Sequence, residues 1–375
     1  MQRQVGPRRS DLLNSLAGWS FSENEIQEAT AGSRMLNPSL DLSNPCNLNC
    51  PYCFIEEKNS PRKARFPDEL SIQETFAVID DFADSGAGTV SLVGAGEPTI
   101  DPYFEEIVLH IARHQMTPVI FTNGIRLARD KSLIQILYES SASVVLKFNS
   151  LSSRIQDLVA GRDGYVALRN RALEALLDWG FNKTYPTRLA FDIITFRGNF
   201  SELPQIHRLA RRQNIHPVLA DYIPTGRTSG GTFQGLASIG NRSLKERLEI
   251  QMILEPLTAQ QRHALFEKLE QIDKDEFGIS RDGGAAYFSG SSCTQALGVY
   301  VDVHGNIWPC VARSKAINRK LVPGKLGNIR AGDLPSRIWE KDRYLAALRS
   351  AYDGACLYKP LISLTSRLPI IGGIL

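Results

Sequence analysis

Residues 40–53 read LDLSNPCNLNCPYC, a short apolar run followed at once by three closely spaced cysteines. A run rich in aliphatic residues is typical of a strand that is buried on both faces of a sheet. In a sheet of parallel strands, ligands and reacting groups gather at the carboxyl ends of the strands. We therefore expect the cysteine loop to lie at the carboxyl edge of a parallel sheet.

The same kind of apolar run recurs further along the chain, at 89–93, 118–121, 143–148, 189–195 and 216–223. The segments between these runs have the periodicity of helices, and Ser71 with Glu74 fits a capping box at the start of the first of them. Strands that alternate with helices imply a parallel sheet, and six such units are too few for a closed eight-stranded barrel. The expected fold class is therefore α/β, a partial (β/α)6 TIM-like barrel with a small C-terminal domain.

The composition excludes several classes of protein. Of 375 residues, 43% are apolar and the formal net charge is +3. No apolar stretch approaches the roughly 20 residues of a membrane helix, the N-terminal residues lack the apolar core of a signal peptide, and the basic residues are dispersed. We expect a cytoplasmic protein with no membrane and no nucleic acid among its partners, in which the six cysteines stay reduced.

A change in composition divides the chain. Residues 225–241 are rich in Gly, Ser and Thr and read as a linker or loop. Further on, 298–309 has the pattern of a hairpin that turns at Gly305-Asn306. The expected division is an N-terminal lead-in at 1–38, the partial barrel at 39–227 and a smaller C-terminal domain at 228–375.

Cys46, Cys50 and Cys53 form a pattern that suits an inorganic cluster. Three thiolates in so tight a loop can bind one iron–sulfur cluster, and three ligands for four irons leave one iron open for a substrate or cofactor. A structural zinc site would need a fourth Cys or His nearby, and the closest histidine is His110. Three buried thiols, or a zinc site completed from elsewhere in the chain, are the alternatives to the cluster.

The Cys46-x3-Cys50-x2-Cys53 spacing resembles that of the radical S-adenosylmethionine (radical SAM) superfamily. The resemblance implies a 4Fe–4S cluster whose open iron binds the amino and carboxylate groups of S-adenosylmethionine. It also implies an electron donor such as flavodoxin or ferredoxin, cleavage of the cofactor to a 5′-deoxyadenosyl radical, and abstraction of hydrogen from a substrate C–H bond. In this family the cofactor supplies the difficult chemistry and the protein positions and shields it.

Further segments match the family in register with the cysteines. Gly94-Ala95-Gly96-Glu97-Pro98 is similar to the family's Gly-Gly-Glu-Pro segment, which holds the methionine ammonium, with Ala95 as a departure from it. The resemblance implies further contacts with the cofactor: Tyr52 with the adenine, Asn149 and Ser150 with the ribose, and Arg162 with the methionine carboxylate. Each has a structural alternative, as a packing, turn or surface residue.

Cys293, Cys310 and Cys356 form a second group late in the chain. Their spacing around the predicted hairpin resembles the SPASM domain or its shorter twitch form, which binds auxiliary clusters. Three cysteines are enough for one further 4Fe–4S cluster, and Lys359 stands where a fourth cysteine ligand would be. The alternative is three unrelated buried cysteines.

The resemblance implies a radical SAM oxidoreductase of the twitch or SPASM type. The expected substrate is a hydroxyl-bearing small molecule such as an aminocyclitol or sugar, and a peptide that is modified after translation is the alternative. Oxidation of an alcohol needs a group that takes up a proton, and Lys147, Asp192 and Tyr222 are the candidates. A non-catalytic iron–sulfur sensor is the alternative from another class, although a sensor would not need a cofactor-binding turn after the second strand.

Overall fold

The computed structural model describes residues 15–31, 34–42, 45–54, 65–94, 96–221, 227, 243–279, 297–311 and 324–350. The predictions for Ala95, Tyr222, Cys293 and Cys356 lie outside these residues. Among the described helices, each is too short or too polar to cross a bilayer.

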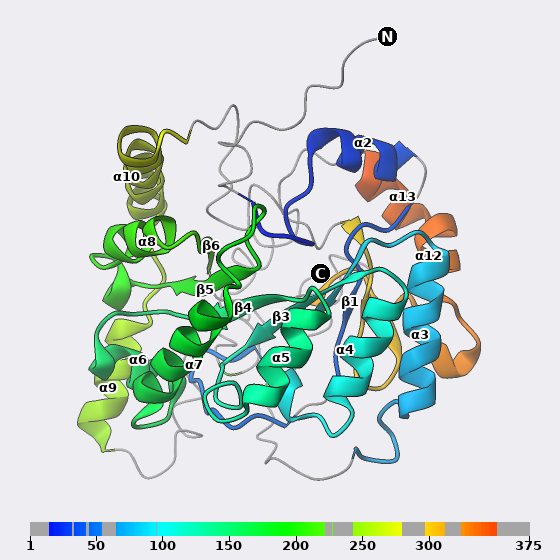
Figure 1. Cartoon of the computed structure of the whole chain (residues 1–375), viewed down its shortest axis with the longest axis horizontal. Coiled ribbons are helices and arrows are strands. Elements are labelled where there is room, and N and C mark those ends of the chain that lie inside the picture. The colour runs from blue at the N-terminus through cyan, green and yellow to red at the C-terminus, as the bar shows by residue number, and fades with distance from the viewer. Residues whose placement is uncertain are drawn as a thin grey trace, which may run out of the picture.

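One curved sheet of nine strands organises the part of the chain that the structure describes, in the order β6-β5-β4-β3-β2-β1-β7-β8-β9 (Figure 1). Six of its strands form a parallel series: β1 (Ser39–Leu40), β2 (Thr89–Leu92), β3 (Thr117–Thr122), β4 (Ser143–Lys147), β5 (Leu189–Thr195) and β6 (His216–Asp221). These strands coincide with the six predicted apolar runs, so the α/β fold with a parallel sheet is confirmed.

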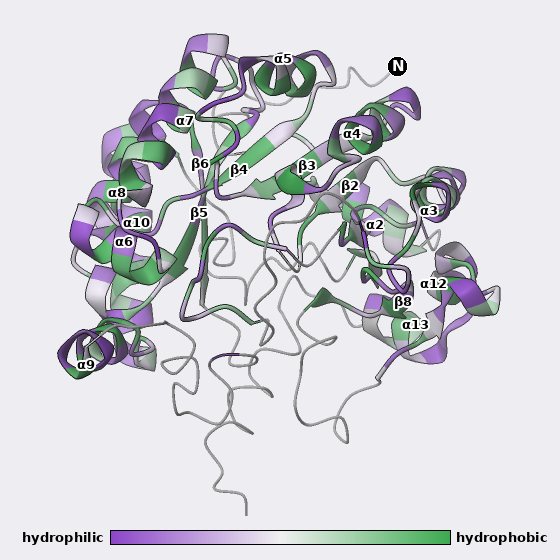
Figure 2. Ribbon diagram, turned by 90° about the horizontal axis from the view of Figure 1, so that it is seen from below, coloured by the Kyte–Doolittle hydropathy of each residue, from purple (hydrophilic) through white to green (hydrophobic). Residues whose placement is uncertain are grey.

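Helices connect the parallel strands and cover the outer side of the curved sheet (Figure 2). The connecting helices are α3 (Ile72–Asp84), α4 (Phe104–Arg113), α5 (Lys131–Glu139), α6 (Ser153–Ala160), α7 (Tyr165–Trp179) and α8 (Leu203–Arg212). The capping box of Ser71 and Glu74 is present at the start of α3, as predicted. Helix α6 was not predicted, although Ser152 caps its first turn and Gly161 ends it in a left-handed conformation.

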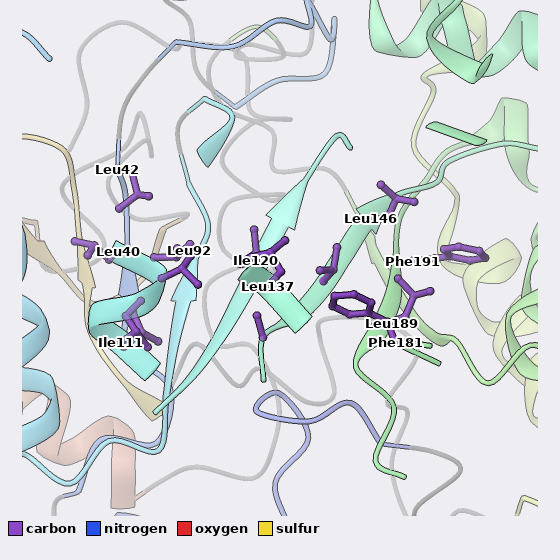
Figure 3. Close-up of a cluster of buried hydrophobic side chains, with 14 of the residues drawn as sticks. Leu40, Leu42, Leu92, Ile111, Ile120, Leu137, Leu146, Phe181, Leu189 and Phe191 are labelled. Atoms are coloured by element: carbon purple, nitrogen blue, oxygen red, sulfur yellow. The ribbon is translucent and has the colours of Figure 1, made fainter. Parts of the chain in front are cut away.

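The main core lies between the sheet and these outer helices. Figure 3 shows side chains from successive strands, with Leu92, Ile120 and Leu146 in one layer against Ile111 of α4 and Leu137 of α5. All five are fully buried. Burying an aliphatic side chain of this size contributes about 1.5–3 kcal/mol, so this layer is a main source of the stability of the barrel.

The inner face of the sheet is apolar at one end and polar at the other. Val119, Val145 and Ala190 point inward and pack against Leu16, which closes that end. Because side chains alternate along a strand, the next inward positions toward the carboxyl ends include Lys147 of β4 and Asp192 of β5. These two residues are partners in the β4–β5 register, so the fold places two opposite charges side by side on the inner face.

The late hairpin extends the same sheet. Strand β7 (Tyr300–Val301) pairs parallel to β1, and β8 (Asn306–Trp308) and β9 (Gly327–Asn328) follow in antiparallel order. The predicted hairpin is confirmed, with Gly305 at φ 75° in its turn. The turn is centred on Val303 and His304, two residues earlier than expected, because the Gly305 amide donates to the Asp302 carbonyl and Asn306 is already the first residue of β8.

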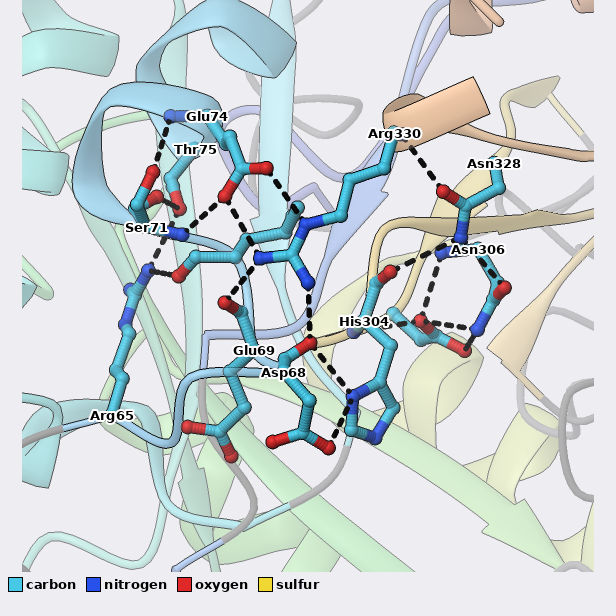
Figure 4. A network of polar contacts seen from close by, with 12 residues as sticks. Arg65, Asp68, Glu69, Ser71, Glu74, Thr75, His304, Asn306, Asn328 and Arg330 are labelled. Carbon is cyan, nitrogen blue, oxygen red and sulfur yellow. Dashed lines mark hydrogen bonds and ion pairs between the residues drawn. The ribbon is translucent and has the colours of Figure 1, made fainter. Parts of the chain in front are cut away.

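A polar network holds this hairpin region against the start of α3 (Figure 4). The Arg330 guanidinium donates to both carboxylate oxygens of Glu74, at 2.8 and 3.0 Å, and to the backbone carbonyls of Asp68 and Glu69. The hydrogen bond from Arg330 is the main reason that the pKa of Glu74 is lowered to about 2. The capping residue of α3 is therefore also an anchor for the C-terminal part of the chain.

The other late helices lie over the opposite side of the barrel. Helix α9 (Leu244–Ile253) contacts the short η2 turn (Arg197–Asn199), and α10 (Ala259–Phe277) packs on α8. At the α8–α10 contact, Asp273 accepts hydrogen bonds from His207 at 2.6 Å and from Arg211 at 2.9 Å. The side chains of all three are almost completely buried, so this is an internal ionic cluster.

Candidate functional site

The cysteine loop follows β1 at the carboxyl edge of the parallel sheet, as the sequence predicts. Cys50 is buried, whereas Cys46 and Cys53 are partly exposed. Backbone contacts make the loop compact, with the Cys53 amide donating to the Cys50 carbonyl at 3.2 Å and the Leu48 amide pointing at the Cys46 sulfur at 3.5 Å. The three thiols lie close together, since the charges of neighbouring thiols contribute to the raised pKa of both Cys46 and Cys50.

The surroundings of these thiols are apolar. Leu48 and Tyr52 pack with Leu158 and Val159 of α6 and with Phe196 after β5, in a cluster that is separate from the main core. Burial raises the pKa of the Cys46 and Cys50 thiols, and charge repulsion between neighbouring thiolates raises it further. A bound metal cation lowers the pKa of the thiols that bind it and so deprotonates them. The three thiols are therefore a donor set that fits an iron–sulfur cluster.

The C-terminal end of α6 and the residues just after it are hydrogen-bonded to the cysteine loop. The Asn49 amide donates to the Ala160 carbonyl at 3.0 Å, and Arg162 donates to the Asn47 carbonyl at 3.0 Å. Gly161 lies between these contacts with φ 64°, and a Cβ atom there would stand 2.0 Å from the Asn49 carbonyl oxygen. Arg162, predicted to contact a cofactor carboxylate, is therefore also a support of the cysteine loop.

Gly161→Ala is expected to displace the cysteine loop and to lower the iron and sulfide bound per chain several-fold. A left-handed conformation costs a residue with a side chain about 1–2 kcal/mol, and here the contact with Asn49 adds to that cost. Gly164→Ala is the matched control, because Gly164 has φ 71° but nothing within 4 Å of the added Cβ. Equal iron and sulfide contents in the two variants would contradict the role of Gly161.

Arg227 is a residue of the site that the sequence analysis missed. Its guanidinium donates to the Cys50 carbonyl at 2.8 Å and its amide donates to the Cys53 carbonyl at 3.1 Å. The residue is 6% exposed, and its charge, with that of Lys147, partly offsets the burial that raises the pKa of Cys50. No local pattern could have indicated this contact, because 177 positions separate Arg227 from Cys50.

The turn after β2 is joined to the cysteine loop. The Glu97 amide donates to the Pro45 carbonyl at 2.9 Å, and the side-chain amide of Asn123 donates to Asn47 at 2.7 Å. Gly94 passes so close to Asp41 that a Cβ atom would stand 2.2 Å from its carboxylate, which explains the glycine. Gly96 has φ 77°, a second conformation that favours glycine.

The Glu97 carboxylate is buried and holds the ends of two strands together. One of its oxygens accepts from the hydroxyls of Thr99 and Thr122 at 2.6 and 2.5 Å, and the other accepts from the Asn123 amide at 2.7 Å. Burial raises the pKa of Glu97, and these hydrogen bonds lower it in part. A carboxylate has about four acceptor positions, so the Oε2 atom that faces Asn123 retains capacity for one further donor.

Tyr52 is the centre of a polar group next to Cys50. Its phenol oxygen accepts from Lys147 at 2.8 Å and from the side-chain amide of Asn149 at 2.7 Å. Lys147 also lies 3.7 Å from the Asp192 carboxylate, so the two candidate catalytic residues of the inner face form an ion pair. Burial raises the pKa of Tyr52 above its ordinary value, and the phenol therefore stays protonated at neutral pH.

Asn149 and Ser150, the predicted ribose contacts, are fully buried. The Asn149 side-chain oxygen accepts from the Ile194 amide at 2.9 Å, and the Ser150 hydroxyl donates to Glu202 at 2.7 Å. These contacts join the ends of β4 and β5 and the start of α8. A ribose contact stays a prediction for these two residues, and it would require their present contacts to open.

The second group of cysteines is represented by one member in the described part of the chain. Cys310 follows β8 and is 5% exposed, whereas Cys293 and Cys356 lie outside the described residues. The structure thus brings together Cys46, Cys50, Cys53, Glu97, Tyr52, Lys147 and Asp192 around the carboxyl edge, and adds Arg227. The auxiliary site stays a prediction from the spacing of its cysteines.

Comparisons with known proteins agree with this site. Residues 41–209 match the model of the Radical SAM superfamily, a range that includes the cysteine loop, the Glu97 turn and Asp192. The mycofactocin maturase MftC of Mycolicibacterium smegmatis is 27% identical over 187 residues, which are 50% of this chain and 44% of that protein. The chain therefore covers less than half the length of this relative.

Three further matches cover most of the chain. The AdoMet-dependent heme synthase of Oleidesulfovibrio alaskensis is 22% identical over 340 residues, or 88% of this chain and 81% of that protein. The crystal structure of Streptococcus suis SuiB bound to S-adenosylmethionine matches with a TM-score of 0.59 at 16% identity, covering 92% of this chain and 80% of that chain. SuiB bound to its precursor peptide SuiA matches with a TM-score of 0.55, covering 91% and 76% of the two chains. At these identities the structural matches establish a common fold.

Proposed function

We propose that the chain is a radical SAM enzyme, which cleaves S-adenosylmethionine reductively and abstracts a hydrogen atom from a peptide substrate, because residues 41–209 match the model of the Radical SAM superfamily. The observation that carries the proposal is the compact loop of three thiols at the carboxyl edge, tied to the glycine-rich turn by the hydrogen bond from Glu97 to Pro45. The loop offers three thiol ligands, and the turn offers an acceptor for an ammonium group beside them.

Each residue of the site has a proposed role. Cys46, Cys50 and Cys53 would hold a 4Fe–4S cluster, which supplies the electron that cleaves the sulfonium and yields a 5′-deoxyadenosyl radical. The carboxylate of Glu97 would accept a hydrogen bond from the methionine ammonium, and Arg162 lies at the loop to pair with the carboxylate. Arg227 would hold the loop in position through its two backbone contacts.

A peptide substrate is favoured by the relatives. One is a maturase, and one protein of the same fold is seen with a precursor peptide. A hydroxyl-bearing small molecule is the second candidate, and the Lys147–Asp192 pair is the observation that favours it. A paired carboxylate on the inner face is a group that could take up the proton released when an alcohol is oxidised to a ketone.

The substrate class is tested by the yield of 5′-deoxyadenosine. Anaerobically reconstituted protein is reduced with dithionite and supplied with S-adenosylmethionine and either a panel of synthetic peptides, including any short peptide found to be encoded beside its gene, or a panel of aminocyclitols. We expect a peptide substrate to raise the yield of 5′-deoxyadenosine at least ten-fold over the yield without substrate. The peptide should lose mass in proportion to the 5′-deoxyadenosine that is formed. Stimulation by an aminocyclitol, with no response to any peptide, would replace the proposal by the second candidate.

A further inference from the structure

A cluster of metal-ligating side chains lies away from the cysteine loop, between α3 and α4. It contains Asp80 of α3 together with His110 and His114, which lie one turn apart at the end of α4. Helix α4 ends just before β3 begins, so the cluster is near the amino ends of the strands. The cysteine loop and Glu97 lie at the opposite, carboxyl edge.

The three side chains converge on one point. The Nε2 atoms of His110 and His114 lie 2.7 and 2.8 Å from the same Asp80 carboxylate oxygen. A spacing of four residues puts the two histidines on one face of α4, and this face is the one that meets α3. The convergence therefore comes from the packing of two helices, which fixes the ligand positions before any ion arrives.

A neighbouring ring restricts the first histidine. Phe76 of α3 stacks on His110 with ring centroids 4.2 Å apart and an interplanar angle of 15°, and the His110 and His114 centroids are 5.1 Å apart. The His110 side chain is only 18% exposed. Little freedom of the His110 ring is lost when it binds an ion, whereas the 34% exposed His114 can adjust to the geometry that the ion requires.

The donor set and its dimensions suit zinc. Ligands at about 2.0–2.1 Å from a tetrahedral ion lie about 3.3 Å from one another, so these atoms need to separate by roughly half an ångström. The exposed Asp80 and His114 side chains permit that movement. Imidazole nitrogens with one carboxylate oxygen form a typical N2O set for zinc, whereas the soft thiolates of the cysteine loop select iron–sulfur clusters.

We propose that Asp80, His110 and His114 form a structural site for a divalent transition-metal ion, with zinc as the preferred ion. The ion joins α3 to α4 and leaves one coordination position open to water. The ion would also stabilise the contact between α3 and the C-terminal part of the chain. Asp81, next to Asp80, accepts hydrogen bonds from the backbone amide and the hydroxyl of Ser336 in α12 (Pro335–Lys341).

Calorimetric titration of zinc into tag-free, cluster-loaded protein tests the site. We expect one zinc ion per chain, an X-ray absorption spectrum with only nitrogen and oxygen in the first shell, and at least ten-fold weaker binding in His114→Ala and Asp80→Asn. Both residues are exposed enough for these variants to fold, which circular dichroism verifies. Cleavage of S-adenosylmethionine is expected to be unchanged in His114→Ala.

His263→Ala is the matched control, because His263 lies 3.3 Å from Glu267 on α10 with both side chains exposed and should not affect the titration. Absence of zinc binding, sulfur in the first shell, or equal affinity in His114→Ala and His263→Ala would each overturn the site.

Discussion

Simultaneous replacement of Cys46, Cys50 and Cys53 by alanine is expected to reduce 5′-deoxyadenosine formation to the level of a protein-free control. The replacement removes the three thiolates that would hold an iron–sulfur cluster at the carboxyl edge, so no electron would reach the sulfonium. The measurement is chromatography of the products after anaerobic reconstitution with iron and sulfide and reduction with dithionite. Cleavage that persists in the triple variant would refute the assignment of the site.

Cys310→Ala provides the comparison for that experiment. Cys310 is buried after β8, and we expect its replacement to lower the iron content while 5′-deoxyadenosine is still formed. The triple variant and Cys310→Ala are thus expected to lose different clusters and to differ in cleavage. If Cys310→Ala binds as much iron and sulfide as the unaltered protein, Cys310 is not a ligand of an auxiliary cluster.

Asp273→Asn is expected to destabilise the protein by about 3–5 kcal/mol, because it removes the carboxylate charge that pairs with the buried guanidinium of Arg211. Thermal or urea unfolding of the variant measures the loss. Glu276→Gln is the matched control, since Glu276 also pairs with α8, through Arg208, but on the surface. An exposed pair contributes about 0–1 kcal/mol, and equal losses in the two variants would show that burial of the Asp273 cluster has no special effect.

The buried cluster around Asp273 also leads to a prediction about the stability of the protein at acid pH. Burial alone would raise the pKa of Asp273, but hydrogen bonds from His207 and Arg211 hold it far below its usual range. A carboxyl group whose pKa is lowered by folding contributes stability that is complete above its unfolded value of about 3.9 and is lost as the pH falls further. The difference in unfolding midpoint between the unaltered protein and Asp273→Asn should therefore shrink below about pH 4.

The strands and most helices could be predicted because their signals are local. Buried parallel strands read as apolar runs, and Ser71 with Glu74 marks a helix start in the sequence itself. Helix α6 also had local signals at Ser152 and Gly161, but it is only eight residues long, so its apolar periodicity extends over little more than two turns. In the segment around Arg162 only the arginine was used for a prediction, so the helix that ends two residues before it was not predicted.

The remaining features depend on contacts between distant segments. The pairing of β7 with β1, the contact of Arg227 with the cysteine loop and the approach of Asp80 to the two histidines have no signature in any short window. Only the four-residue spacing of His110 and His114 is a local signal. Polar residues at strand ends pose a different difficulty. Lys147 ends β4 and Asn149 follows it by two residues, and both donate to the Tyr52 phenol. Lys147 also pairs with Asp192, whereas the fully buried Asn149 side chain accepts from the Ile194 amide, and neither partner can be read from the local sequence.

The position of β7 has a consequence for synthesis of the protein on the ribosome. Strand β1 pairs with β2 on one side and with β7 on the other, through amides such as those of Ser39 and Asp41 that donate to Val299 and Val301. A nascent chain acquires β2 early, but the other neighbour of β1 only after residue 301 has emerged. Until then the strand that leads into the cysteine loop has one unpaired edge, so the support of the loop is completed only after the chain has been synthesised beyond residue 301.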